Sequence, residues 1–272
     1  MDCPHCGTTA TTERSGLTAQ GYRRYRCCAC KCGFNERTGT VFNRLQFPTD
    51  VVCLVVLWRL RYKRSLRDLA EMFLDRGLKF CHDAVHEWES KLADVLAEGL
   101  RSRRRGKAGV SWYVDETYIK VKDRRCYLYR AIDRDGRLID VRLSATRDMA
   151  AAKAFFASAL ATVGSVPDRV TTDGHDAYPK AISDELGKKV KHRTSRYLNN
   201  RLEQDHRGIK DRYRSMRGFK SFVCARRFCR AHDELRNAYR ALRRCKQYVS
   251  LSRQRRHHRR QFALAMNILQ AA

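Results

Sequence analysis

Between positions 112 and 119 the chain reads Trp112-Tyr113-Val114-Asp115-Glu116-Thr117-Tyr118-Ile119. Aromatic and β-branched side chains favour a strand, in which successive side chains point to opposite faces. Asp115 therefore lies within an otherwise apolar strand, where burying a carboxylate is costly unless it is paired or holds a metal ion. A structural salt bridge is the alternative. Glu116 is expected on the opposite face, outside any site that Asp115 forms.

The segments around this strand predict a mixed α/β fold. Strand-like runs cover residues 111–120, 125–133 and 137–145, and Asp135-Gly136 is a hairpin signal between the last two. A helix over 149–163, a short strand over 169–172, a helix over 177–186, a short strand over 189–192 and a long helix from about Asn200 follow. This order favours an antiparallel hairpin at the edge of a sheet whose later strands are parallel, with helices on its faces.

Two further carboxylates occupy positions where such a fold binds ligands. Asp173 ends the short strand over 169–172, and open α/β sheets bind ligands at the carboxyl ends of their parallel strands. Glu203 follows Asn200 by three residues, which is typical of a helix capping box and also aims Glu203 towards the sheet. Helix capping is thus the structural alternative for both residues. Three carboxylates suit phosphoryl transfer on DNA, which uses two hard cations such as Mg²⁺.

The charge of the chain indicates a polyanionic partner. Lys and Arg number 57 against 29 Asp and Glu, which leaves a net charge of +28. Nucleic acid is the first candidate, because each neutralised phosphate releases counterions, and a membrane surface or a ribosomal or chromatin-like role follows. The basic residues are spread along the whole chain instead of lining one amphipathic helix, which disfavours a membrane partner.

The two ends of the chain carry no sign of a membrane segment. No basic start followed by an apolar stretch opens the sequence, and the longest apolar run, residues 51–58, is shorter than the ~20 residues that span a bilayer. We therefore expect a cytoplasmic, nucleoid-associated protein. Residues 241–272 are expected to form a basic helix or frayed tail, whose densest cluster at 253–260 contacts phosphates.

The cysteines predict a zinc ribbon over residues 1–47. Six of the twelve cysteines lie within the first 32 residues, and in a cytosolic chain this pattern favours metal binding over disulfides. Two Cys-x-x-Cys knuckles about twenty residues apart suit a structural Zn²⁺ site with four thiolate ligands. The preferred ligands are Cys3, Cys6, Cys27 and Cys30, with Cys28 and Cys32 as alternatives for the second pair. Free thiols in a basic tail are the structural alternative.

Residues 48–105 predict a helix-turn-helix. Thr49 or Asp50 can cap a helix over 51–62, Ser65 can cap a second helix, and a third starts at about His82 after a turn at Gly77. Two helices joined through a glycine turn are typical of a DNA-binding unit whose second helix enters the major groove. A plain helical hairpin that packs on the next domain is the alternative. Residues 101–107 are expected to be a linker that contacts phosphates.

Taken together, these motifs resemble those of the insertion-sequence family six transposases, which are DDE enzymes on a ribonuclease H-like fold. The resemblance covers about residues 40–240, although zinc knuckles occur in only part of that family. The residues that carry it are Val114-Asp115-Glu116-Thr117-Tyr118, Tyr127 to Asp133, Thr172-Asp173-Gly174-His175, and Asn199-Asn200 through Glu203-Gln204-Asp205-His206 to Lys210.

The resemblance implies a ribonuclease H-like catalytic domain over residues 106–240, in which Asp115, Asp173 and Glu203 hold two Mg²⁺ or Mn²⁺ ions. It also implies 3′-strand cleavage at the ends of the element, attack by the freed 3′-hydroxyl on target DNA, copy-type transposition through a cointegrate, and a homodimer bound to two ends. A nuclease on the same fold and a DNA-binding regulator with a decayed third segment are the alternatives. The mark of the regulator is a missing carboxylate, and all three are present.

Lys210 is a further candidate, seven positions after Glu203 and therefore on the same helix face, about 10 Å further along the axis. We expect its ammonium group to hold a phosphate that flanks the reacting bond. The alternative is a solvated helix face on which Arg207 pairs with Glu203.

Overall fold

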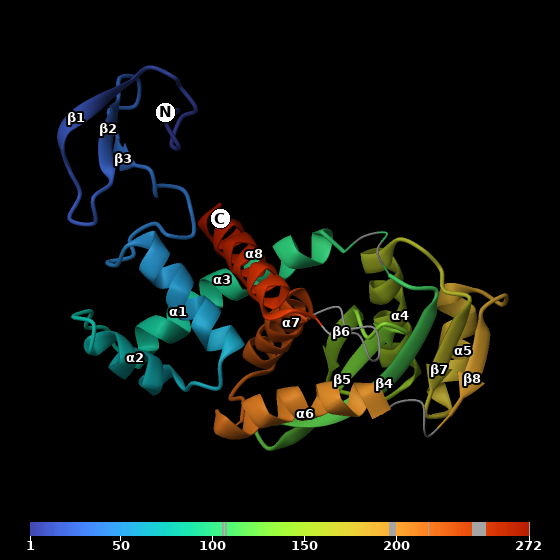
Figure 1. Ribbon diagram of the computed structural model, residues 1–272. Coiled ribbons are helices and arrows are strands. Elements are labelled where there is room, and N and C mark those ends of the chain that lie inside the picture. Colours follow the sequence, from blue (N-terminus) through green and yellow to red (C-terminus); the bar gives the residue numbers. More distant parts are fainter. Residues whose placement is uncertain (105, 107, 196–199, 217, 241–248, 272) are drawn as a thin grey trace.

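A computed structural model describes residues 1–104, 106, 108–195, 200–216, 218–240 and 249–271, with the backbone alone at 200 and 201. Along the chain follow a small antiparallel sheet, a group of helices, and a larger mixed sheet with helices on both faces (Figure 1). The last helix returns to the first group of helices. Asn199 and the Asn200 side chain, part of the predicted capping motif, lie outside the described residues.

The small sheet comprises β1 (Thr11–Leu17), β2 (Arg23–Cys27) and β3 (Gly33–Asn35), paired in that order. Its apolar centre is very small and consists of the buried Cys3, Cys27 and Phe34. So little buried apolar surface does not hold a fold of this size together, since domains below about 40 residues usually need disulfides, metals or oligomerisation.

The helical region contains α1 (Thr49–Arg61), α2 (Leu66–Leu74) and α3 (His82–Ser102). Ser65 caps α2 through a reciprocal capping box with Asp68, as predicted. The predicted cap of α1 is wrong, because Pro48 is the N-cap residue and the Thr49 amide donates to the Tyr22 hydroxyl instead. A side chain from the small sheet thus takes the place of a local cap.

The expectation of a phosphate-contacting linker at 101–107 is wrong for Arg101 and Arg104, which form ion pairs within the protein. Arg101 lies 2.9 Å from Asp140 and Arg104 lies 2.6 Å from Glu234, and both carboxylate side chains are fully buried. Helix α3 continues to Ser102, and these guanidinium groups reach carboxylates on two later elements, residues 138–144 and 222–239. A buried carboxylate demands such a partner, which basic composition alone does not show.

The larger sheet has the order β6-β5-β4-β7-β8, in which β4–β6 are antiparallel and β7 and β8 run parallel to β4. The strands are β4 (Ser111–Val121), β5 (Arg124–Asp133), β6 (Leu138–Ser144), β7 (Arg169–Thr172) and β8 (Lys191–Thr194). The predicted mixed sheet with a hairpin edge and flanking helices is therefore confirmed. Strand β8 starts two residues later than predicted, and the other strands start within one residue of their predicted positions.

Helices cover both faces of this sheet. On one face α4 (Met149–Val163) and α5 (Ala177–Leu186) pack against Trp112 and Val114. On the other face α6 (Asn200–Ser215) and α7 (Phe222–Tyr239) contribute to the core that contains Ile119. The sequence reading missed the break between α6 and α7, where Gly218 has a φ of 84° that ends the first helix.

The last helix, α8 (Leu251–Gln270), has two different halves. In the second half Ala265, Ile268 and Leu269 are buried in the core shared by α1, α3 and α7. The contact with α3 is close, because a Cβ on Gly99 would lie 2.5 Å from Ile268 Cγ2. The first half is mostly exposed and carries no acidic residue.

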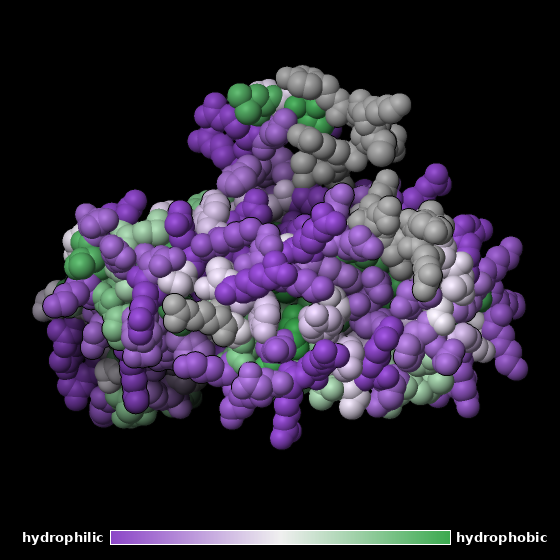
Figure 2. All heavy atoms as spheres, turned by 90° about the horizontal axis from the view of Figure 1, so that it is seen from below, coloured by the Kyte–Doolittle hydropathy of each residue, from purple (hydrophilic) through white to green (hydrophobic). Residues whose placement is uncertain are grey.

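Viewed from below, the side on which α6 lies, the surface is dominated by hydrophilic residues (Figure 2). In the part of the chain that the structure describes, no helix is long and apolar enough to cross a membrane.

Candidate functional site

Asp115 and Asp173 meet because of the register between two parallel strands. The last parallel pair joins Tyr113 of β4 to Thr171 of β7, so two residues further on Asp115 lies level with Asp173. Strand β7 ends at Thr172, and Asp173 leaves the sheet directly beside the continuing β4. The predicted position of Asp173 at the carboxyl end of a parallel strand is confirmed.

Glu116 joins these two residues, contrary to the sequence-based expectation. One oxygen from each of Asp115, Glu116 and Asp173 lies within 4.8 Å of the others, and we call these three residues the carboxylate cluster. Glu116 does point to the other face of β4, where the hydroxyl of Tyr178 from α5 donates to it. The expectation failed because β7 ends at Thr172. Beyond this point no strand of the described residues pairs with that edge of β4, and carboxylates from both faces of β4 meet there.

The carboxylate cluster holds more negative charge than its surroundings balance. Burial, then the neighbouring Glu116 and Asp173, raise the pKa of Asp115 to about 7. Arg147, from the loop between β6 and α4, forms ion pairs with Glu116 and, at 3.2 Å, with Asp173. Three hard oxygen donors at this spacing, with one guanidinium beside them, suit a divalent cation such as Mg²⁺.

Glu203 lies on the first turn of α6 and is exposed. Among the described residues, Glu203 is not part of the group whose carboxylate oxygens lie within 4.8 Å of one another. Its helix nevertheless reaches the cluster, because His206 Nδ1 lies 3.8 Å from Asp115 Oδ2. His206 follows Glu203 by three residues and so shares its side of the helix. The structure therefore brings two of the three predicted carboxylates together and places the third on the neighbouring helix.

His206 is a site residue that the sequence analysis named only within the motif carrying the family resemblance, without a role of its own. It is buried, and burial, then the positive charge of Arg130, lower its pKa to about 3, so the imidazole is neutral. Its Nε2 atom has no hydrogen-bond partner among the described residues. The signal available in the sequence was its position, three residues after Glu203 on the helix face that meets β4.

Lys210 lies further along the same contact between α6 and β4. Its Nζ atom is 5.2 Å from the centre of the Tyr118 ring, a cation–π contact. Tyr118 follows Asp115 by three residues, or about 10 Å of strand. Among the ion pairs of the described residues, none joins Glu203 to Arg207. Lys210 thus contacts β4, the strand that carries Asp115.

Behind the cluster, buried charges are paired. Arg130 of β5, which pairs in register with Asp115, forms an ion pair with Asp233 of α7. Burial alone would raise the pKa of Asp233, but Arg130 and His232 hold it below its usual range. We call the ion pairs Arg130–Asp233, Arg101–Asp140 and Arg104–Glu234 the paired network.

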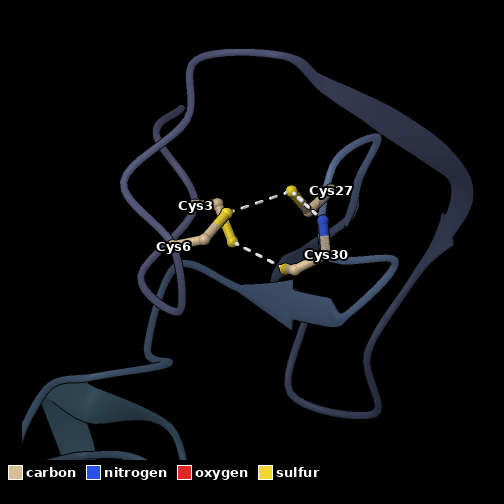
Figure 3. A group of neighbouring side chains, drawn as sticks. All are labelled: Cys3, Cys6, Cys27 and Cys30. Atoms are coloured by element: carbon tan, nitrogen blue, oxygen red, sulfur yellow. Dashed lines mark hydrogen bonds between the residues drawn. The ribbon is translucent and has the colours of Figure 1, made fainter.

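A second group of potential metal ligands lies in the small sheet. The Sγ atoms of Cys3 and Cys30 are 3.6 Å apart, those of Cys6 and Cys27 are 3.5 Å apart, and all four point towards one another (Figure 3). A tetrahedral site with Zn–S distances of about 2.3 Å separates its sulfur atoms by about 3.8 Å. The four sulfur atoms brought together are the preferred set, whereas Cys28 and Cys32 are exposed and outside it.

The thiol chemistry of the second knuckle also suits a metal. Although burial opposes it, hydrogen bonds from the Cys30 amide and from the thiols of Cys30 and Cys6 lower the pKa of Cys27 to about 6. At neutral pH this residue is therefore a thiolate, the form that binds Zn²⁺.

Comparisons with known proteins give a family model and transposase relatives. A family model described as a DDE domain matches residues 109–242, which contain Asp115, Asp173, Glu203 and Lys210. The transposase for insertion sequence-like element IS431mec of Staphylococcus aureus strain Mu50 is 38% identical over 187 residues, which cover 66% of this chain and 83% of that relative. The transposase for insertion sequence element IS257 in transposon Tn4003 of Staphylococcus aureus matches with the same identity and coverage.

Solved structures give weaker similarity. A chain of the simian T-cell lymphotropic virus intasome in complex with PP2A regulatory subunit B56 gamma has a TM-score of 0.40 at 18% identity, over 57% of this chain and 56% of that chain. The trimeric form of the HTLV-2 integrase catalytic core domain in complex with magnesium has a TM-score of 0.37 at 18% identity, over 48% and 88% of the two chains.

Proposed function

The chain belongs to the insertion-sequence family six of DDE transposases, and on that premise we propose that Asp115, Asp173 and Glu203 hold the divalent metal ions of its reaction. The observation that carries this proposal is the convergence of Asp115 and Asp173 to within 4.8 Å. The pKa of Asp115, raised to about 7 by burial and by its acidic neighbours, supports it, because a bound cation would relieve this crowding.

Two Mg²⁺ or Mn²⁺ ions, when bound, would activate the attacking oxygen and stabilise the leaving oxygen of a phosphoryl transfer. The protein contributes the arrangement. Asp115 is fixed on β4 and Asp173 on the end of β7, while Glu203 is carried by α6 beside them. Because His206 is neutral, it adds no positive charge that would compete with a metal ion for the Asp115 carboxylate. Lys210, about 10 Å along β4, would hold a phosphate beside the reacting bond.

The substrate in this proposal is double-stranded DNA, at the ends of the element and at the target. We propose 3′-strand cleavage at the ends, followed by direct attack of the freed 3′-hydroxyl on target DNA in a dimeric complex at the nucleoid. The exposed first half of α8 would bind phosphates along this DNA. Its arginines are Arg253, Arg255, Arg256, Arg259 and Arg260.

Recognition of the element ends is proposed for residues 1–105. The exposed side of α3 supports only a limited contact with DNA, since its acidic residues would repel phosphates. These residues are Asp83, Glu87, Asp94 and Glu98. The turn from α2 to α3, which precedes these acidic residues, offers the exposed Arg76 and Lys79. We therefore propose that specific contacts are made there, together with the zinc ribbon.

A strand-transfer assay tests the catalytic proposal. The full-length protein is incubated with Mg²⁺, labelled DNA carrying the ends that flank its own gene, and a target plasmid. Asp115→Asn, Asp173→Asn and Glu203→Gln should each abolish joining while leaving end binding nearly intact. The matched control is Asp168→Asn, an exposed carboxylate at the opposite end of β7, which should join ends at the normal rate. Full joining by any one of the first three variants would remove that residue from the site.

A further inference from the structure

Glu116 is the most deeply buried carboxylate of the cluster. Its side chain is 4% exposed, against 19% for Asp115 and 35% for Asp173. A carboxylate so far from water is costly unless something uses its charge. The transposase reaction as proposed above assigns it no task.

One oxygen of Glu116 is fixed from behind. The buried hydroxyl of Tyr178 donates to Oε2, and the Tyr178 ring is held in the core by an edge contact with Phe156 at 6.0 Å between ring centres. The other oxygen, Oε1, is turned to Arg147, which also contacts Asp173.

Arg147 therefore occupies the place that a cation would take between two carboxylates. It comes from a loop, its side chain is 35% exposed, and its guanidinium contacts the two residues with one nitrogen. When ionised, the three carboxylates carry three negative charges, of which this single guanidinium balances one, whereas a divalent ion in its place would balance two. A guanidinium and a divalent ion compete for the same oxygens, because both need the carboxylate lone pairs.

We propose that Glu116 is a fourth carboxylate of the metal centre and that Arg147 holds its place in the metal-free protein, leaving when a divalent cation binds. The inference rests on the proposed function, since it requires metal at Asp115 and Asp173. It adds that residues on both faces of β4 contribute to the centre. It also predicts opposite effects of removing two residues that contact each other.

The test is Mn²⁺ binding to the full-length, zinc-loaded protein without DNA, measured by the loss of the free Mn²⁺ electron paramagnetic resonance signal. Glu116→Gln should raise the Kd for Mn²⁺ at least tenfold. Glu116→Asp, which keeps the charge but shortens the side chain, should raise it at least threefold. Arg147→Gln should lower the Kd at least threefold. Thermal unfolding in EDTA checks that each variant is folded.

Two charge-matched controls separate direct ligation from general electrostatics. Asp176→Asn removes an exposed carboxylate three residues after Asp173, and Arg193→Gln removes an exposed cation from the adjacent strand β8. Both should leave the Kd within about twofold, since exposed charges are screened.

The outcomes distinguish this inference from the function it rests on. If Asp115→Asn abolishes Mn²⁺ binding but Glu116→Gln leaves the Kd unchanged, Glu116 is not a ligand and the inference is wrong while the metal centre stands. If Arg147→Gln has no larger effect than Arg193→Gln, Arg147 does not compete for the site. If Mn²⁺ binding is unchanged in Asp115→Asn, or if no Mn²⁺ binds to the wild type, both the metal centre and the inference are wrong.

Discussion

Asp115 on β4 and Asp233 on α7 belong to one sheet-and-helix core, yet their surroundings have opposite effects. Asp233, in the paired network, contacts Arg130 and His232, and its pKa lies below the usual range. Asp115, in the carboxylate cluster, contacts other carboxylates and a neutral imidazole, and its pKa is raised to about 7. A buried carboxylate therefore stabilises the fold where a side chain of opposite charge pairs with it, and marks a binding site where its neighbours are other carboxylates.

The largest expected effect is on the rate of strand transfer when Asp115 is replaced. Asp115→Asn should slow strand transfer by about 10⁴-fold or more, or about 5.5 kcal/mol. Its free energy of unfolding at pH 8 in EDTA should be equal to or above that of the wild type. At this pH, above the folded pKa of about 7, the ionised carboxylate opposes folding, and the amide removes that cost. Chemical denaturation measures stability, and a clear loss of stability would place Asp115 among the structural charges.

The second largest expected effect is a loss of folding stability when Asp233 is replaced. Asp233→Asn should lower the free energy of unfolding at pH 7 by about 3–5 kcal/mol, because it leaves Arg130 buried without its partner. The folded pKa of Asp233 lies below its unfolded value, so its stabilisation is present above the unfolded pKa and is lost as pH falls. Denaturation should therefore show a constant difference between the variant and the wild type from pH 7 down to about pH 4, and convergence as the pH falls further. Parallel curves at that lower pH would mean that the ion pair is not the source of stability.

The cysteine group extends the comparison to a third set of crowded ligands. The purified, reduced protein should contain about one Zn²⁺ per chain, and Cys27→Ser should reduce this to nearly none. Because the small sheet has hardly any apolar core, the variant should also lose the protection of residues 1–47 against proteolysis. Cys28→Ser, which changes the neighbouring exposed thiol, is the control and should keep its zinc. Metal analysis that finds no zinc in the wild type would contradict the site.

The smallest effect concerns a charge that neither fold nor metal requires. Lys210→Ala should slow strand transfer about tenfold, or about 1.4 kcal/mol. The free energy of unfolding should fall by less than about 1 kcal/mol through loss of the Tyr118 contact. Arg207→Ala, three residues earlier on α6 and exposed, should have little effect on either measurement. A normal joining rate for Lys210→Ala would leave Lys210 as part of a solvated helix face.

The sequence predicted the mixed sheet because each of its elements carries a strong local pattern. Three local patterns were sufficient to predict the strands and the position of Asp173 at the carboxyl end of a parallel strand. They are the alternation in residues 112–119, the hairpin signal at Asp135-Gly136 and the short apolar strand before Asp173. Such features depend on residues close in sequence or on the general rules of parallel sheets.

The features that the sequence did not predict depend on tertiary contacts. Nothing near Arg147 indicates that it pairs with a strand residue 31 positions earlier, and the end of β7 that lets Glu116 join the cluster is a property of two strands together. The same holds for Arg101 and Arg104, whose partners lie on other elements. Local patterns give elements, whereas the balance of buried charge emerges only when the elements pack.

The contact between Gly99 and Ile268 has a consequence for the order of events during synthesis. About 170 residues separate the two, so at about 5–20 residues per second the ribosome adds Ile268 roughly 10–30 s after Gly99. Until then α1 and α3 expose the apolar surface that α8 will cover. The catalytic sheet can thus fold before the helical region is complete. A chain interrupted after β8 but before α8 would carry the carboxylate cluster on a body with an open, aggregation-prone side.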